Sequence, residues 1–234
     1  MRLHRFYIDQ QINDKKEIRI EDTDLLNQWE KVFRLKAGDK VILFDGSGSE
    51  YEAVFELISK KEAVLKIVDT KKIEKEDKIE LHIFQSIIKK DNFEMIVQKC
   101  TEIGTGAFHP VISERSEKKN LNIERLEKIA KEASEQSGRV NLPKIFAPEK
   151  LEGGIEKFDG KLFVLDFDSS PIDPRIREND NDSKLGILIG PEGGWSEKER
   201  ELFRQKGIES ISFGSQVLRA ETAAIVASAL ILLR

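Results

Sequence analysis

From residue 79 onward, the chain alternates short apolar runs with segments whose apolar residues recur at helical spacing. The apolar runs lie at Ile79–Gln85, Ala107–Ile112, Lys161–Asp166, Leu185–Gly190 and Ser210–Phe213. Helical periodicity covers residues 93–103, 123–136, 196–206 and 220–234. Strands that alternate with amphipathic helices pair in parallel, because each helix crosses over the sheet before the next strand begins. The pattern predicts an α/β domain with a parallel sheet covered on both faces.

The first third of the chain has a different pattern, with short runs of branched and aromatic residues. These runs lie at Leu3–Ile8, Lys40–Phe44, Tyr51–Leu57 and Ala63–Val68, and a helix is expected at Asp24–Lys36. Short strands at this spacing favour a small β-barrel. The charged stretch over residues 70–78 is typical of a linker. We therefore expect two domains, at residues 1–72 and 73–234.

Charge and composition exclude several classes of protein. The 234 residues include 39 Lys and Arg against 43 Asp and Glu, a net charge of −4, which argues against a chain that coats nucleic acid. Any polyanion must therefore be held by a local patch. A single Cys and three scattered His predict no disulfide and no metal site. The longest apolar stretch is about half the ~20 residues that span a bilayer, and the N-terminus lacks the apolar core of a signal peptide. These features indicate a soluble cytoplasmic protein with no membrane association.

The segment from Leu185 to Glu199 is the most informative for chemistry. An apolar strand leads into Gly190-Pro191-Glu192-Gly193-Gly194, and a helix with the Ser-x-x-Glu capping pattern begins at Ser196. Glycines at the end of a strand let the backbone approach a ligand closely. The pattern is neither a dinucleotide fingerprint nor a phosphate-binding P-loop. A plain strand–helix connection explains one or two of these glycines, and the full cluster favours a ligand site.

A second strand–loop–helix junction follows at Phe213–Ala224. Gly214 ends the strand, and Arg219 and Glu221 lie where the loop becomes a helix, a place where α/β sheets often carry catalytic side chains. A surface ion pair between these two residues is the alternative.

The helix expected at Ala220–Arg234 is apolar around its whole circumference. Such a helix must be buried on all sides, either within one chain or partly against a second subunit. Another segment, Glu135–Arg139, ends a helix with more polar groups than a cap requires. Arg139 there either binds a phosphate or belongs to an ordinary solvated helix end.

The sequences Ile189-Gly-Pro-Glu-Gly-Gly-Trp-Ser196 and Leu218-Arg-Ala-Glu-Thr-Ala-Ala224 together resemble the SPOUT superfamily of S-adenosylmethionine-dependent RNA methyltransferases. Phe33–Asp39, Glu114–Ser116 and Glu135–Arg139 look like its RsmE branch, the 16S rRNA uracil-N3 methyltransferases. The chain departs from that branch at Gln28-Trp29 and Phe33, and Glu102-Ile-Gly104 is a variant of a family Glu-Leu-Gly. The departures affect RNA docking or packing more than the cofactor loops.

The resemblance implies an N-terminal PUA-like RNA-binding barrel and a C-terminal SPOUT-type α/β domain with a trefoil knot. It also implies a homodimer formed through the C-terminal domain, with 16S rRNA or the small ribosomal subunit as partner. The alternatives are a SPOUT enzyme acting on another base or a ribose, and a non-catalytic RNA-binding protein of the same fold.

The same resemblance assigns roles to residues. S-adenosyl-L-methionine is expected to contact Leu165, Ile189, Gly190, Pro191, Gly194, Phe213, Gly214, Val217, Leu218 and Ala223. Arg219 is expected to stabilise negative charge on the uracil, and Glu192 to orient or deprotonate it. RNA phosphates are expected to contact Arg2, Arg5, Arg34, Lys36, Arg115 and Arg139.

Overall fold

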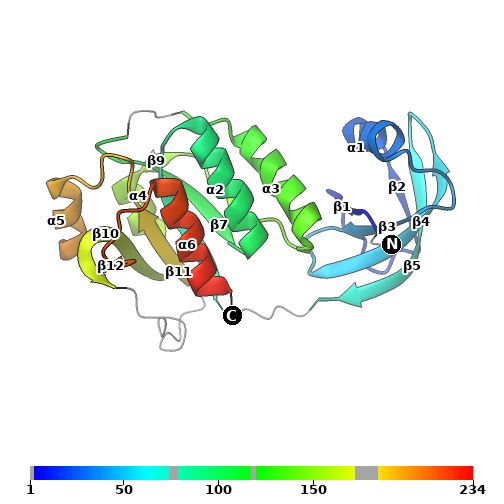
Figure 1. Cartoon of the computed structure of the whole chain (residues 1–234). Coiled ribbons are helices and arrows are strands. Elements are labelled where there is room, and N and C mark those ends of the chain that lie inside the picture. The colour runs from blue at the N-terminus through cyan, green and yellow to red at the C-terminus, as the bar shows by residue number, and fades with distance from the viewer. Residues whose placement is uncertain (1–2, 74–78, 117–119, 172–183, 234) are drawn as a thin grey trace. The chain divides into compact units, whose positions relative to one another are not determined.

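The computed structural model describes residues 3–73, 79–116, 120–171 and 184–233 (Figure 1). The chain divides into two compact units. Unit 1 is Met1–Lys75 with Ser134–Asn141, and unit 2 is Glu76–Ala133 with Leu142–Arg234. The polar run over residues 179–183, for which the sequence predicts an exposed loop, lies outside the described residues.

Unit 1 contains a twisted sheet of short strands. They are β1 (Arg5–Tyr7), β2 (Glu17–Ile20), β3 (Lys40–Phe44), β4 (Ser49–Ile58) and β5 (Ala63–Lys72), in the order β1-β3-β4-β5-β2. The pairs are antiparallel except for β1 with β3. Alternate residues of these strands face one core around the fully buried Trp29. Strand β2 was not expected from sequence, because it is short and carries only two apolar residues, Ile18 and Ile20.

The helix expected at Asp24–Lys36 is shorter and divided in two. Helix α1 (Thr23–Asn27) is capped by the Asp22 side chain and continues into the π-helical turn η1 (Gln28–Phe33). The helix ends at Arg34, whose φ of 55° places it in the left-handed region. Apolar spacing alone does not register the change of helical pitch or this early stop.

Unit 2 alternates strands with helices, as expected. Its strands are β6 (Glu80–Ser86), β7 (Ala107–Ile112), β8 (Lys144–Ile145), β9 (Glu149–Lys150), β10 (Lys161–Pro171), β11 (Lys184–Ile189) and β12 (Glu209–Ser212). Its helices are α2 (Lys90–Ile103), α3 (Ile123–Ser137), α4 (Leu151–Lys157), α5 (Glu197–Gln205) and α6 (Ala220–Leu232), with the end of α3 belonging to unit 1.

The sheet of unit 2 is parallel at every described pairing, in the order β12-β10-β11-β6-β7-β8, with β9 also on β7. Neighbouring residues of one strand face different cores. Ile83 and Ile187 point toward α2, α3 and α6, whereas Phe84 and Leu188 point toward α4 and α5. The sheet is thus covered on both faces, and the α/β prediction is confirmed (Figure 1).

The strand order places β11 between β6 and β10, although β10 precedes it in the chain. As a result, the carboxyl ends of β10, β11 and β12 are neighbours at one edge of the sheet. The short elements β8, β9 and α4 were not expected, because two-residue strands and a helix containing Gly153-Gly154 give no clear periodicity.

Candidate functional site

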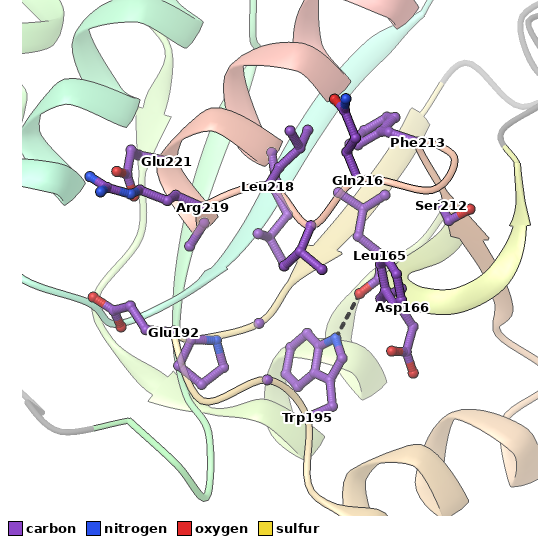
Figure 2. Close-up of a pocket in the computed structure, with 18 of the residues that line it drawn as sticks. Leu165, Asp166, Glu192, Trp195, Ser212, Phe213, Gln216, Leu218, Arg219 and Glu221 are labelled. Atoms are coloured by element: carbon purple, nitrogen blue, oxygen red, sulfur yellow. Dashed lines mark hydrogen bonds between the residues drawn. The ribbon is translucent and has the colours of Figure 1, made fainter.

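A pocket of about 660 Å³ opens at the carboxyl edge of the unit 2 sheet, between β10 and the loops that follow β11 and β12 (Figure 2). The start of α2 and the start of α6 complete its wall. Each residue expected to contact the cofactor lines this pocket: Leu165, Ile189, Gly190, Pro191, Gly194, Phe213, Gly214, Val217, Leu218 and Ala223. Glu192 and Arg219 line it as well. Two motifs more than twenty residues apart therefore form one site.

The loop after β11 is a tight turn with Trp195 packed against it. The Gly194 N–H donates to the Pro191 carbonyl at 2.8 Å, and Gly194 has a φ of +66° that favours glycine. A β-carbon on Gly190 would lie 3.2 Å from the Trp195 ring, so a larger residue there would require the ring to shift by a few tenths of an ångström. The indole N–H of Trp195 donates to the Leu165 carbonyl at 3.0 Å and joins the loop after β11 to strand β10 (Figure 2).

Glu199 stabilises this same loop through hydrogen bonds to both of its carboxylate oxygens. Its carboxylate accepts from the Ser196 N–H at 2.7 Å, completing the predicted capping box. The other carboxylate oxygen accepts from the Glu114 N–H at 2.8 Å, and the side chain is buried. The exposed Arg115 donates to the Gly193 carbonyl at 2.8 Å. The segment after β7 is therefore fastened to the glycine turn.

Charged side chains lie along the pocket wall. The guanidinium of Arg200, in α5, lies 3.0 Å from the carboxylate of Asp166, in β10, and forms an ion pair with it. Lys89 and Asn92 contribute from the first turn of α2, and Glu221 from the first turn of α6. Arg219 is the N-cap residue of α6 and is exposed, as is Glu192.

The residues expected to bind RNA differ in how exposed their side chains are and in whether they already have partners. Arg34, Lys36 and Arg115 are exposed. Arg2 lies outside the described residues. Within unit 1, Arg5 pairs with Glu50 and donates to the carbonyls of Gly138 and Arg139 at 3.1 and 3.2 Å. These contacts occupy its guanidinium, so Arg5 holds the 138–139 backbone in this structure.

Arg139 is half-buried, and this burial lowers the pKa of its guanidinium to about 10. Burial also raises the pKa of the Cys100 thiol, which lies in the core of unit 2, to about 12. The described part of the chain has no helix long and apolar enough to cross a membrane, and no group of three or more His, Cys, Asp or Glu placed to hold a metal ion.

Sequence reasoning singled out Glu221 without giving it a role, and it missed several other pocket residues: Lys89, Asn92, Asp166, Phe167, Trp195, Arg200, Ile211, Ser212, Gln216 and Ala220. For Lys89 and Asn92 a signal was available, because they directly follow a parallel strand, as the predicted loops do. For Arg200 no such signal existed, since it lies inside a helix and reaches the pocket only through the packing of α5.

The family models and the related sequences that match this chain all point to one family. Residues 75–232 match the RNA methyltransferase domain family, and residues 31–68 match the RNA methyltransferase PUA domain. Ribosomal RNA small subunit methyltransferase E of Rickettsia conorii is 31% identical over 98% of this chain and 95% of its own length. The protein of the same name from Synechocystis is 32% identical over 88% of this chain and 70% of its own length.

Solved structures share the fold over nearly the whole chain. Ribosomal RNA small subunit methyltransferase E from Neisseria gonorrhoeae, bound to S-adenosyl methionine, has a TM-score of 0.86 at 25% identity, covering 97% of this chain and 96% of that one. A Legionella pneumophila structure in complex with the bound cofactor SAM has a TM-score of 0.88 at 27% identity, covering 99% and 97%. With an RNA methyltransferase domain match over most of its length and a PUA domain match before it, this chain belongs to the RNA methyltransferase family.

Proposed function

We propose that this protein transfers a methyl group from S-adenosylmethionine to N3 of a uracil in the 16S rRNA of the small ribosomal subunit. The observation that carries the proposal is the pocket at the carboxyl edge of the unit 2 sheet, which gathers both glycine-rich motifs. The names of the relatives, and the cofactor present in two similar structures, support this methyl donor and this class of RNA.

The pocket suits S-adenosylmethionine in size and in lining. Its volume of about 660 Å³ falls in the range of small-molecule sites, roughly 300–1,000 Å³. Leu165, Ile189 and Leu218 offer apolar surface for an adenine ring. At Gly194 and Gly214 an added β-carbon would meet only open space, so the bare backbone is accessible to a ligand. When bound, the cofactor supplies an electrophilic methyl group on a positively charged sulfur.

The residues of the chain must then handle the charge of the acceptor base. A uracil imide nitrogen becomes a good nucleophile only as it loses its proton, and negative charge spreads onto the neighbouring carbonyl oxygens. In our proposal the Arg219 guanidinium stabilises this charge, because it is held at the mouth of the pocket as the N-cap of α6. Glu192, on the exposed glycine turn, orients the base.

RNA phosphates are contacted by a few basic side chains. Arg34 and Lys36 at the end of η1 and Arg115 after β7 are exposed and suited to this task. Arg139 and Arg2 complete the proposed set, whereas Arg5 contributes only if its contacts with Glu50 and the 138–139 carbonyls exchange. With a net charge of −4, such binding depends on local contacts and on the shape of a structured RNA.

We further propose a SPOUT-type trefoil knot, in which the segments 185–199 and 213–224 meet around the pocket. A homodimer formed through α6 is part of the same proposal, since Leu230 and Leu233 there are 42% and 53% exposed. The protein acts in the cytoplasm, where ribosomal subunits are available.

Two measurements test the function. Calorimetric titration with S-adenosylmethionine is expected to give saturable binding to the purified protein. Mass-spectrometric mapping of 16S rRNA with and without the gene is expected to show one methylated uracil that disappears on deletion. Binding without methylation would leave an RNA- and cofactor-binding protein, and a methyl group on a ribose or another base would replace the uracil assignment.

Substitution of the proposed charge-stabilising residue gives a sharper result. Arg219→Ala is expected to slow single-turnover methylation by about 10²–10³-fold, because a preorganised donor to the developing anion is lost. RNA and cofactor dissociation constants are expected to change by less than about threefold. Arg204→Ala, on the solvent side of α5, is the control and is expected to leave all three quantities unchanged. An Arg219→Ala variant that lost RNA binding but kept its single-turnover rate would show that Arg219 contacts phosphate instead.

A further inference from the structure

Glu221 is a buried carboxylate in the wall of the pocket. The residue is only 8% exposed, and its Oε2 is shielded from solvent without a hydrogen-bond partner. A buried acceptor without a donor is costly and rare in folded proteins, so each case calls for an explanation. Because Glu221 lines the pocket, the missing donor is one that a ligand can bring.

The part of the pocket around Glu221 is polar and positively polarised. Glu221 lies in the first turn of α6, and the start of α2 lines the same pocket through Lys89 and Asn92. In neither helix does the N-cap side chain accept a hydrogen bond from the first turn, and both place the positive ends of their dipoles at the pocket. Arg219 adds a full positive charge. A group that develops negative charge during a reaction is stabilised in such surroundings.

The remainder of the pocket has a different character. Figure 2 shows Glu221, Arg219 and Glu192 at one end, and Leu165, Asp166, Gln216 and Phe213 at the other, with Leu218 between them. The apolar middle and the glycine loops suit the cofactor. The end with Glu221 is left for the nucleotide that accepts the methyl group.

We propose that Glu221 is the proton acceptor for the uracil, an assignment that rests on the function proposed above. Its Oε2 takes the N3 proton, the freed N3 electron pair forms the new bond to the methyl carbon, and the carbon–sulfur bond breaks with its electrons remaining on sulfur. The protonated carboxyl then returns its proton to solvent after the product leaves. Arg219 stabilises the anion formed between these events.

Glu221 suits this role better than Glu192 for a structural reason. Glu192 is exposed on the glycine turn, so water competes for its oxygens. Glu221 Oε2 is screened from water and has no hydrogen-bond partner, so a rotation of the side chain toward the pocket lets it accept from a base that enters. In the empty pocket the uracil N3–H is the donor that this oxygen lacks, and N3 methylation removes that donor.

The first experiment measures single-turnover methylation with saturating cofactor and RNA. Glu221→Gln keeps the shape of the side chain but cannot hold the transferred proton, and it is expected to lower the rate about 10²–10⁴-fold. Glu221→Asp keeps the carboxylate and is expected to recover part of that loss. The matched control is Glu152→Gln, which alters the exposed glutamate at the corresponding position of α4 and is expected to retain the wild-type rate.

The second experiment needs no cofactor. It measures the affinity of the protein for a 16S rRNA fragment that carries, at the mapped target position, either uracil or N3-methyluracil. The wild-type protein is expected to prefer uracil at least tenfold, because only uracil brings a donor to Oε2. Glu221→Ala, which removes the acceptor and opens space for the methyl group, is expected to reduce the preference below about threefold.

These outcomes separate the inference from the proposed function. If wild-type protein methylates the uracil but Glu221→Gln keeps its rate, or the preference for uracil survives in Glu221→Ala, the assignment of Glu221 is wrong. If Glu221→Gln instead weakens S-adenosylmethionine binding more than tenfold, the carboxylate serves the cofactor and the assignment is again wrong. If the wild-type protein binds no cofactor and methylates no rRNA, the proposed function itself fails. Thermal unfolding of each variant confirms that it is folded.

Discussion

At the scale of single residues, Trp195 shows how one side chain can join a loop to the sheet. Its ring packs on Gly190, and its indole N–H reaches the Leu165 carbonyl in a different strand. Leu165 belongs to β10 and pairs with Ile211 of β12, so this hydrogen bond ties the glycine turn to the sheet. The shape of the proposed cofactor pocket therefore depends on a residue that does not itself need to take part in the chemistry.

Trp195→Phe tests this role, because it keeps an aromatic ring and removes only the indole N–H. A net hydrogen bond is worth about 0.5–1.5 kcal/mol, so the dissociation constant for S-adenosylmethionine is expected to rise by roughly three- to tenfold. The control is Trp29→Phe, because the Trp29 indole N–H is buried in unit 1 with no hydrogen-bond partner. Calorimetry measures both variants. An unchanged dissociation constant in Trp195→Phe would show that ring packing alone fixes the glycine turn.

The sequence predicted well which residues line the pocket, but it predicted poorly whether a side chain is buried, paired or exposed. The glycine motifs located Gly190, Gly194 and Gly214 at the pocket, because glycine patterns report backbone geometry directly. The same reasoning did not distinguish the engaged Arg5 from the exposed Arg34. Burial and pairing depend on residues distant in the chain, such as Glu50 and Gly138 for Arg5, which no local pattern reveals.

At the scale of elements, β6 and β7 carry a buried histidine pair away from the pocket. His82 Nε2 lies 3.2 Å from a Glu80 carboxylate oxygen, and His82 Nδ1 lies 2.9 Å from His109 Nε2. Because the carboxylate accepts, neutral His82 carries its proton on Nε2, and His109 Nε2 donates to His82 Nδ1. His109 is also stacked between Phe84 and Phe146, each with ring centroids at 4.1 Å.

This arrangement predicts a pH-dependent stability. Burial, with the nearby His82 and Lys144 charges, lowers the pKa of His109 to about 3, and burial also lowers the pKa of His82, although Glu80 opposes that shift. The unfolded chain therefore binds more protons than the folded chain below pH ~6.5. The free energy of unfolding is expected to be retained above pH ~6.5 and to fall as pH decreases toward 3, by at most about 1.4 kcal/mol per pH unit for each histidine.

Urea unfolding at a series of pH values measures this slope. His109→Phe keeps a ring between Phe84 and Phe146 but cannot titrate, so its slope between pH 6 and 4 is expected to be smaller than that of the wild type. Its absolute stability also changes because His82 Nδ1 loses a donor, which is why the slope and not the value is compared. Identical slopes in the two proteins would mean that carboxylates alone determine the acid sensitivity.

Elements with strong periodicity were predicted and elements without it were not. The strands from β6 to β12 that carry continuous apolar runs, and helices α2, α3, α5 and α6, lie close to their expected positions. Strand β2 and the small elements from β8 to α4 were missed, since each is too short to show a period. The insertion of β11 between β6 and β10 also has no local signal, because strand order arises from packing of the whole sheet.

At the scale of the whole molecule, the proposed dimer gives a direct test. Leu230 and Leu233 expose apolar surface on α6, and Val217 near its start is 78% exposed. Light scattering at micromolar concentration is expected to give twice the 26.8 kDa mass of one chain. Leu230→Glu places a charge in the proposed interface and is expected to give the monomer mass. A wild-type protein of monomer mass would refute the dimer.

Helix α6 belongs both to the pocket and to the core. Its first turn lines the pocket, and the rest of the helix, through Ala224, Ala227 and Ile231, is part of the main core of unit 2. Any local opening that frees this helix destroys the pocket, and any ligand that occupies the pocket opposes that opening. Ligand binding energy is therefore added to the local stability of the helix in proportion to the logarithm of ligand concentration. A higher concentration of a ligand that fills the pocket is therefore expected to lower the fraction of molecules in which α6 is locally open.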